Sequence, residues 1–400
     1  MQIYLCNGTA AQEWKIYDDK TIRVQGLCLD GQSGVTTALT SAVINTCSSA
    51  TSQKWQLGAT GAVVNQASGA CLEDKNSLTA NLTPVWLNTC NDTAAQSWIA
   101  PQVPSQTALY EPPNGKTYIG VAVNLANLPA FNSATGVTTQ PAIYNSFTGK
   151  DGDFQYQFTR LKSYPNITPS ITWNVTFTKN SVTNGSRDAY IKAAAESAKA
   201  YGKPVFVRLN WEMNGFWSSN YDRTGGVTPA QYVASWRYIY NIFKATAPNV
   251  AFVWAPNGGM PKSDELGIPK LPLSNWYPGD SYADWIGFSA YPEYSSPASN
   301  VLTKPEGLNY IAEYAASHGK PLMLAEWARG TLTQPFSADT SVPVDLIFGW
   351  ANSYPNTVKA LVYFDNIDGR DHVLETHPIA AAAYRSYTVG NPKYLYNIVQ

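Results

Sequence analysis

The sequence predicts two domains, an all-β repeat domain followed by an α/β domain of the (β/α)8 barrel type. Three observations support this division. All five cysteines lie within the first 90 of the 400 residues, a short motif recurs in the same segment, and short apolar segments alternate with amphipathic ones from residue 116 onward. We place the first domain at residues 1–101, a proline-rich linker at 102–115 and the second domain at 116–400.

The composition fits a protein that handles neutral, ring-shaped ligands. Basic and acidic residues number 27 and 28, for a net charge of −1, while aromatic residues make up 13%. Such a balance creates no field that favours nucleic acid or an anionic membrane, and no apolar segment reaches the ~20 residues that span a bilayer. Sugars fit, because their C–H faces stack on aromatic planes. We therefore expect a polysaccharide partner, no nucleic acid, no membrane and a monomeric chain.

The cysteines indicate disulfides rather than a metal site. A metal cluster would combine closely spaced cysteines with histidines, but all three histidines lie in the last quarter of the chain, so we expect neither metal nor cofactor. The intervals Cys28 to Cys47 and Cys71 to Cys90 are both 19 residues, and Cys6 is left over. The first residues lack the pattern of a signal peptide, yet disulfides imply an oxidising compartment, so we expect a secreted, extracellular protein.

A short motif repeats through the first hundred residues. Gln-x-Trp begins at Gln12, Gln53 and Gln96, at intervals of 41 and 43 residues. Cys-Leu followed by an acidic residue precedes the second and third copies, at Cys28 and Cys71. Short β-prone segments separated by Gly, Asn and Ser predict a repeat unit of about four strands.

These motifs resemble the ricin-type β-trefoil lectin domain. The resemblance implies the disulfides Cys28–Cys47 and Cys71–Cys90, and a first repeat that has lost its opening strand together with the partner of Cys6. It also implies that the motif tryptophans help to build the core. The second repeat lacks a ring where the family has one, so at most one or two sugar pockets are expected to be complete. The implied sugar-binding residues are Asp30, Glu73, Trp86, Asn91 and Gln96.

The second region has the size and rhythm of a (β/α)8 barrel. The expected strands are 118–124, 141–146, 167–175, 205–209, 250–254, 285–290, 322–325 and 358–364. The helical patterns include 187–201, 229–246, 305–317 and 343–352. A doubly wound sheet is the alternative, but the glycine-rich phosphate turn typical of that fold is absent from the sequence.

Two glutamates directly follow apolar strand segments, where a barrel carries its catalytic groups. Glu212 comes just after the expected fourth strand and Glu326 just after the seventh. A charge buried there without purpose would cost roughly several kcal/mol. Salt bridges to Arg208 or Arg329 are one explanation. Cleavage of a glycosidic bond is the other, because one carboxyl must give a proton while the other attacks the sugar or activates water.

The second region resembles glycoside hydrolase family 26, within a clan of retaining barrel hydrolases. Residues 208–217, residues 277–287 and Glu326 carry the resemblance in the right order. It implies Glu212 as the acid/base and Glu326 as the nucleophile. It also implies Tyr291, on the rim of the sixth strand, as the tyrosine that hydrogen-bonds the nucleophile.

One position departs from the family pattern. A histidine or asparagine normally precedes the acid/base and touches the sugar at the cleaved bond, whereas Trp211 stands here and Asn210 is one step earlier. Since side chains alternate along a strand, Asn210 replaces that residue only if the backbone bulges. The reaction class is therefore expected to hold, and the identity of the sugar is left open.

Residues near the expected rim are the candidates for substrate binding. They are Arg208, Asn210, Trp211, Trp217, Trp173, Trp254, Asn257 and Phe364, of which Trp173 and Trp254 could equally belong to the barrel wall. A row of rings favours stacking on several sugars and an internal cut, so we expect an endo-acting enzyme. β-1,4-Mannan is expected first, as the commonest substrate of the resembled family. A β-1,3- or β-1,4-linked glucan or xylan is the alternative, and a lectin fused to an inactivated barrel is the non-enzymatic one.

Overall fold

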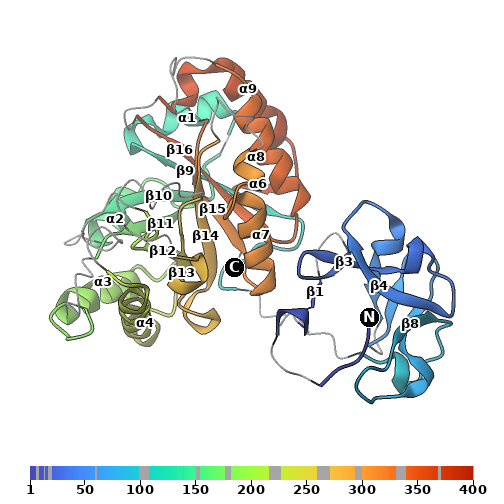
Figure 1. The fold of residues 1–400 in the computed structure, drawn as a ribbon. Coiled ribbons are helices and arrows are strands. Elements are labelled where there is room, and N and C mark those ends of the chain that lie inside the picture. The colour runs from blue at the N-terminus through green and yellow to red at the C-terminus, as the bar shows by residue number, and fades with distance from the viewer. Residues whose placement is uncertain are drawn as a thin grey trace. The chain divides into compact units, whose positions relative to one another are not determined.

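The chain folds into two compact units, Met1–Ser105 and Gln106–Gln400, which Figure 1 draws and which are described separately. The computed structural model describes residues 1–5, 9–12, 14–16, 20–58, 61–98, 108–137, 139–149, 154–175, 182–215, 227–258, 271–292, 300–329, 339–367 and 371–399. Cys6, for which the sequence suggests no partner, lies outside these residues.

The first unit is all-β, as predicted, and its strands pair in the order β1-β2-β3-β4-β8-β7-β6-β5. The strands are β1 (Lys15–Ile16), β2 (Ile22–Val24), β3 (Leu27–Gly31), β4 (Thr40–Thr46), β5 (Trp55–Leu57), β6 (Val63–Asn65), β7 (Cys71–Asp74) and β8 (Val85–Asn88). Single turns of 3-10 helix interrupt them: η1 (Ala10–Gln12), η2 (Gln32–Gly34), η3 (Thr51–Gln53), η4 (Lys75–Ser77) and η5 (Ala94–Gln96). Both expected disulfides, Cys28–Cys47 and Cys71–Cys90, are present.

The motif tryptophans of the second and third repeats tie their units together in the same way. The indole N–H of Trp55 donates to the Leu29 carbonyl at 3.1 Å, and that of Trp98 donates to the Leu72 carbonyl at 2.9 Å. The sequence separation is 26 residues in both cases, so the two repeats share one internal register. Trp55 is buried in a core with Leu29 and Leu72, which makes it part of the scaffold.

The second unit is a closed barrel of eight parallel strands. They are β9 (Thr117–Val123), β10 (Ile143–Thr148), β11 (Thr168–Trp173), β12 (Val205–Leu209), β13 (Val250–Trp254), β14 (Trp285–Ala290), β15 (Leu322–Trp327) and β16 (Val358–Asp365). Each strand pairs with the next, and β9 pairs with both β10 and β16, which closes the sheet on itself. The predicted (β/α)8 architecture is therefore confirmed. A short strand, β17 (Tyr394–Leu395), adds to β9.

Helices follow the barrel strands. They are α1 (Leu128–Thr135), α2 (Phe154–Arg160), α3 (Asp188–Tyr201), α4 (Pro229–Thr246), α6 (Asn300–Thr303), α7 (Leu308–Ser317), α8 (Val342–Ser353) and α9 (Pro378–Thr388), with 3-10 turns η6 (Leu125–Asn127), η8 (Leu273–Trp276), η9 (Asp280–Tyr282) and η10 (Leu374–Thr376). Helix α4 begins where the sequence indicates, because the Thr228 hydroxyl accepts a hydrogen bond from the Gln231 amide and Pro229 occupies the first turn. Among the described residues, no helix combines the length and apolar character needed to cross a membrane.

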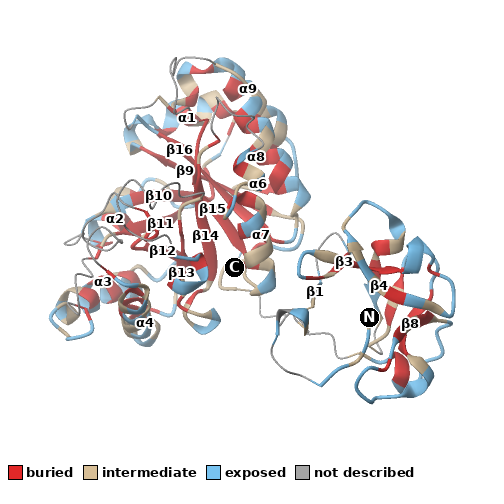
Figure 2. Ribbon diagram, in the orientation of Figure 1, coloured by how far each residue is buried: buried red, intermediate tan, exposed pale blue. Residues whose placement is uncertain are grey.

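Two packed layers bury both faces of the barrel strands, which Figure 2 shows as a continuous band of buried residues. Side chains such as Phe206, Trp285 and Met323 fill the barrel interior. Alternate residues on the same strands, such as Val207 and Leu324, pack against the surrounding helices. This two-sided burial explains why the strands read as continuous apolar runs rather than as alternating ones.

The proline-rich segment is only partly a linker, which corrects the expected boundary at residue 115. Tyr110 donates from its hydroxyl to the Asn249 carbonyl at 2.9 Å, and its ring packs edge-on against Phe206. The Trp285 indole donates to the Leu109 carbonyl at 2.8 Å. Residues 108–115 therefore belong to the barrel unit, because they close its interior at the N-terminal ends of the strands.

Candidate active site

The candidate site is built at the C-terminal ends of the barrel strands, starting with Arg208. Phe206 and Arg208 are two residues apart on β12 and so share the inner face of the barrel. Phe206 belongs to the apolar filling of the interior. Arg208, only 1% exposed, lies one layer above it and presents a guanidinium group to the mouth of the barrel.

A β-bulge turns Glu326 toward the same point. In strict alternation along β15, Glu326 would share the outward face of Leu324 and Ala325 would point inward. The pairing with β14 shifts at this position: Phe288 pairs with Leu324, but Ser289 pairs with Glu326, so Ala325 has no partner of its own. Bulges of this kind re-aim a side chain, and they are common beside active sites.

The backbone also turns sharply at Glu212, just after β12. Asn210 and Glu212 have positive φ angles of 40° and 56°, which ends the strand geometry. The Asn210 amide side chain pairs with the Val175 backbone, accepting from its N–H at 2.6 Å and donating to its carbonyl at 2.7 Å. Asn210 is fully buried. Its expected role in substrate binding is therefore corrected: it anchors the loop after β11.

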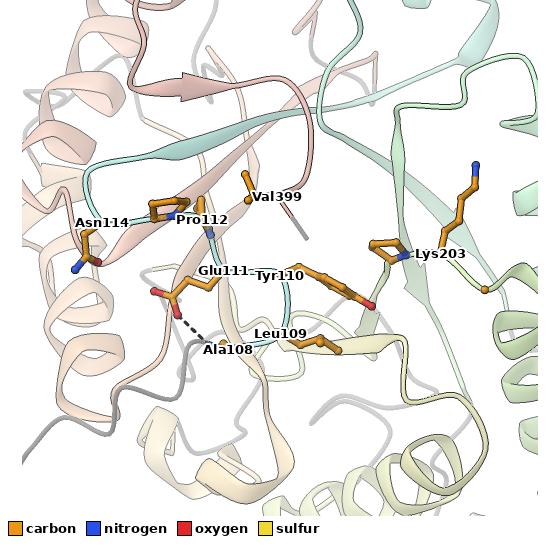
Figure 3. Close-up of a pocket in the computed structure, with 11 residues that line it drawn as sticks. Ala108, Leu109, Tyr110, Glu111, Pro112, Asn114, Lys203 and Val399 are labelled. Atoms are coloured by element: carbon orange, nitrogen blue, oxygen red, sulfur yellow. Dashed lines mark hydrogen bonds between the residues drawn. The ribbon is translucent and has the colours of Figure 1, made fainter.

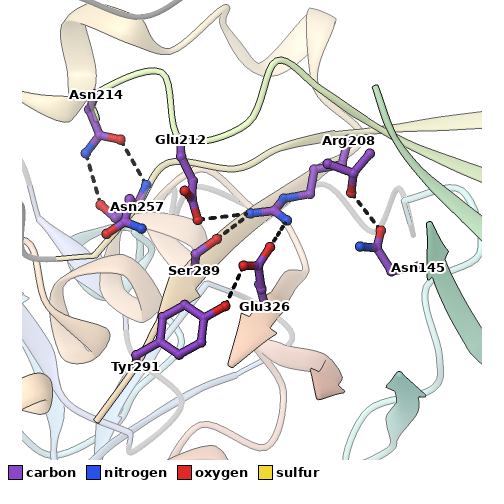
Figure 4. Close-up of polar contacts among 9 residues, drawn as sticks. Asn145, Arg208, Glu212, Asn214, Asn257, Ser289, Tyr291 and Glu326 are labelled. Atoms are coloured by element: carbon purple, nitrogen blue, oxygen red, sulfur yellow. Dashed lines mark hydrogen bonds and ion pairs between the residues drawn. The ribbon is translucent and has the colours of Figure 1, made fainter. Parts of the chain in front are cut away.

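One guanidinium holds both glutamates (Figure 4). Arg208 Nη1 lies 2.7 Å from Glu326 Oε2, and Nη2 lies 3.6 Å from Glu212 Oε1. Arg208 also donates to the hydroxyl of Ser289, the residue that pairs with Glu326 across the bulge. All three charged residues are buried. The salt bridge that the sequence suggested for Arg208 is therefore present. The same guanidinium contacts both carboxylates, so the salt bridge places Glu212 and Glu326 beside each other.

The two glutamates have different surroundings, and those of Glu212 raise its pKa. Burial and, next in size, the negative charge of Glu326 together raise the pKa of Glu212 to about 7, although Arg208 and hydrogen bonds with Ser289 and Asn257 lower it in part. Glu326 has the closer contact with Arg208, and the Tyr291 hydroxyl donates to its other oxygen, Oε1, at 2.5 Å. A pKa near neutral suits Glu212 to the donation of a proton.

A pair of asparagines fixes the loop beside Glu212. Asn214 donates from its side chain to the Asn257 carbonyl at 3.0 Å and accepts from the Asn257 amide at 2.9 Å. The Glu212 amide donates to the Ala255 carbonyl at 2.7 Å. These bonds join the segment after β12 to the segment after β13. Asn257, a sequence candidate, thus meets Glu212, while Asn214 and Ser289 were not identified from the sequence.

Aromatic rings line the barrel mouth near the carboxylates. The Arg208 guanidinium lies 5.9 Å from the centre of the Trp211 ring. Phe364, at the end of β16, packs edge-on against Tyr291 with ring centres 6.3 Å apart. Phe147, which the sequence did not single out, lies between them and contacts both Trp211 and Phe364. No local sequence pattern indicates a role for Phe147, because the rings that it contacts come from segments far away in the sequence.

Two further candidates are corrected. Trp173 and Trp254 are both completely buried, so neither offers a ring face to a sugar. Trp173 packs against Phe154, and Trp254 packs against Tyr277. Both are wall residues, the alternative that the sequence left open. Trp217 lies outside the described residues.

The sugar-binding candidates of the first unit gather around Glu73. Its carboxylate accepts from Trp86 at 2.9 Å and from Gln96 at 2.6 Å. Asn91 is exposed, and its amide donates to Gln96 at 2.9 Å. In the second repeat Asp30 accepts from the side chains of Asn45 and Gln53, both at 3.1 Å. Each acid is thus held by the polar residues of its own repeat.

A second concave feature lies at the other end of the barrel (Figure 3). This pocket of about 650 Å³ is lined by residues 108–114, 202–204 and Val399, all next to the N-terminal ends of the strands. The candidate catalytic residues do not line it. Within the described parts of the chain, no group of three or more histidine, cysteine or acidic side chains is arranged to hold a metal ion.

Known families match both units. The model of the ricin-type beta-trefoil lectin domain matches residues 1–98, and that of glycosyl hydrolase family 26 matches residues 161–330. Endoglucanase H of Acetivibrio thermocellus is 29% identical over 222 residues, which are 54% of this chain and 23% of that protein. The β-1,3-xylanase TXYA of a Vibrio species is 27% identical over 147 residues, 36% of this chain and 28% of that protein. The chain thus spans less than a third of the length of either relative.

Solved structures share the barrel fold. A modular endo-β-1,4-mannanase from Cellulomonas fimi superposes with a TM-score of 0.53 at 16% identity, covering 74% of this chain and 76% of that one. At this identity the likeness concerns the fold alone. The matched regions therefore show that the barrel unit contains a segment similar to glycosyl hydrolase family 26 and that the preceding unit is similar to the ricin-type β-trefoil lectin domain.

Proposed function

We propose that the protein is a retaining, endo-acting hydrolase of a β-linked polysaccharide. The observation that carries this proposal is the single guanidinium of Arg208, which contacts both Glu212 and Glu326. Because both carboxylates contact one planar group, we infer that they are closely spaced. Retaining enzymes hold their carboxyls about 5–5.5 Å apart, whereas inverting enzymes leave room for a water between them.

Each glutamate has one role in each of two steps. In the first, Glu326 attacks the anomeric carbon while Glu212 gives its proton to the departing glycosidic oxygen, so the C–O bond breaks and a glycosyl-enzyme ester forms. In the second, Glu212 takes a proton from water, and the resulting nucleophile releases the sugar and restores Glu326. The raised pKa of Glu212 supports this assignment, because the acid must be protonated at the start.

The substrate is a β-linked mannan, xylan or glucan. Mannan is the expectation from the family resemblance, while the relatives named β-1,3-xylanase and endoglucanase support xylan and glucan. Trp211 also supports the latter two, since it replaces the polar residue that the family uses at the cleaved bond. The trefoil domain would hold the enzyme on a polysaccharide outside the cell.

The test is a product analysis with β-1,4-mannan, β-1,3-xylan and mixed-linkage β-glucan. We expect one polymer to yield a ladder of oligosaccharides, whose newly formed ends are first the β-anomer by NMR. An initial α-anomer would contradict the retaining mechanism, and single sugars released from the start would contradict the endo action. If no polymer is cleaved by the intact chain, the lectin alternative is favoured instead.

A further inference from the structure

Phe147 is an apolar ring left exposed at the mouth of the barrel. It is 41% exposed, and within the described residues of β9–β16 it is the one large hydrophobic side chain with such exposure. It lies four residues after Ile143, a residue of the barrel interior, and therefore on the same inward face of β10. The ring stands above the last filled layer of the barrel, where nothing in the described structure covers it.

Phe147 is the second of four aromatic rings in a continuous row, which we call the aromatic wall: Trp211, Phe147, Phe364 and Tyr291. Successive ring centres are 5.6, 6.2 and 6.3 Å apart, and all three contacts are edge-to-face. One end of the wall lies against Arg208, and the other donates a hydrogen bond to Glu326. The aromatic wall thus extends from Arg208, which contacts both glutamates, to Tyr291, which hydrogen-bonds Glu326.

Edge-to-face packing fixes the plane of the Phe147 ring. Its neighbours Trp211 and Phe364 touch it at 62° and 89° between ring planes, so neither stacks on its face. Such aromatic pairs attract each other beyond the effect of buried surface. The ring is therefore held in one orientation by its neighbours while part of its surface remains open to solvent, which is the arrangement of a stacking platform.

An apolar platform distinguishes sugars by the direction of their hydroxyls. β-Linked glucose and xylose units carry all ring substituents equatorially, so both of their faces present C–H groups. Mannose has an axial hydroxyl at C2, and on that face a hydroxyl pressed against the ring would lose its hydrogen bond to water. Successive units of a β-1,4-linked chain turn over, so a mannan would present the unfavourable face at every second unit.

We propose that Phe147 is a sugar-stacking platform beside the catalytic pair, and that it selects units of gluco or xylo configuration over mannose units. This inference rests on the proposed function and narrows its substrate class. It assigns to the second strand a specificity-determining residue, next to the position where Trp211 replaces a polar side chain.

The test compares Phe147→Ala with Phe147→Tyr, which keeps the ring, and with Tyr156→Ala. Tyr156 is a more exposed ring, on α2 and outside the wall, so its loss controls for removal of any surface aromatic. We expect Phe147→Ala to lower kcat/KM on the preferred xylan or glucan by about tenfold, mainly through KM, while Phe147→Tyr stays within about threefold of the parent and Tyr156→Ala has no effect. The ratio of kcat/KM for this polymer to that for mannan should fall in Phe147→Ala.

The inference is overturned if the parent chain prefers mannan, or if Phe147→Ala loses no more activity than Tyr156→Ala. It is also overturned if Phe147→Ala lowers activity equally on all polymers, because the ring would then support the site without selecting a sugar. A second measurement distinguishes a failure of this inference from a failure of the proposed function. Calorimetry gives the affinity of xylo-, cello- and manno-oligosaccharides for the same variants in chains that also carry Glu326→Ala. If the parent chain cleaves no polymer, the proposed function is refuted. The binding measurements would still show whether Phe147 selects among the oligosaccharides. Any binding by the trefoil domain is the same in all variants and does not affect their comparison.

Discussion

Both units bury a glutamate beside a strand end, and the two glutamates titrate in opposite directions. Glu73 of the trefoil domain and Glu212 of the barrel are 5% and 6% exposed. Burial alone would raise the pKa of Glu73, but hydrogen bonds from Asn88, Trp86 and Gln96 outweigh it and hold that pKa below its usual value. The pKa of Glu212 rises to about 7 because burial is joined by the charge of Glu326.

The difference teaches that burial does not decide protonation by itself. Neutral donors that point at a carboxylate stabilise its charged form, whereas a second carboxylate nearby destabilises it. The trefoil repeat surrounds its acid with donors and so keeps a fixed anion. In the barrel, Arg208 lies closer to Glu326 than to Glu212, and Glu212 has the carboxylate of Glu326 as a neighbour. A fixed anion suits a scaffold or a binding pocket, and a carboxyl poised near neutral pH suits proton transfer.

The largest effect is expected from Glu326→Ala. This change removes the proposed nucleophile and should lower kcat by about 10⁴-fold or more, since the covalent step has no substitute. Product formation from the preferred polymer measures it. The matched control is Glu196→Gln, an exposed carboxylate on α3 whose loss should leave kcat unchanged. If Glu326→Ala cleaves the polymer as fast as the parent chain, Glu326 is not the nucleophile and the proposed mechanism is wrong.

Glu212→Gln tests the raised pKa directly. A carboxyl with a pKa of about 7 is protonated below that pH, so the activity of the parent chain should fall as the pH rises through about 7. Glu212→Gln should lose about 10²–10⁴-fold in kcat on polymer, and the fall above pH 7 should disappear. Activity on an aryl glycoside with a good leaving group should be partly restored, because such a group departs without a proton. An alkaline limb that persists in Glu212→Gln would assign it to another residue.

The sequence predicts the strands and the two glutamates because both depend on local patterns. Apolar runs mark the strands, and an acid directly after such a run is unusual enough to be noticed. The final geometry depends on features without such a pattern. The bulge that re-aims Glu326 arises from the pairing of β15 with β14, and the positive φ of Asn210 sends its amide to Val175.

Roles that depend on neighbours from several strands were the hardest to predict. Phe147 is an ordinary strand residue until Trp211 and Phe364 are brought beside it. Trp254 is the opposite case, because its place at a strand end suggested the rim while its ring faces outward and packs on Tyr277. Helix α4, by contrast, depends on a local pattern: the sequence predicts it at residues 229–246, and it begins at Pro229 after the Thr228 cap.

The smallest effect is expected in the trefoil domain, from Glu73→Gln. Because the pKa of Glu73 is lowered on folding, its contribution to stability is present above the ordinary glutamate pKa of about 4.3 and is lost as the pH falls below that value. Glutamine keeps one acceptor and gives up the charge, so it should destabilise the domain by about 1–3 kcal/mol at pH 7 and by less at pH 3. Calorimetric unfolding of the intact chain at both pH values measures the difference. Asp92→Asn removes an exposed carboxylate from the same repeat and should leave the transition unchanged at both. An equal loss of stability for Glu73→Gln at pH 7 and pH 3 would mean that packing, rather than the charge held by its donors, accounts for the role of Glu73, and the contrast with Glu212 would then rest on the barrel alone.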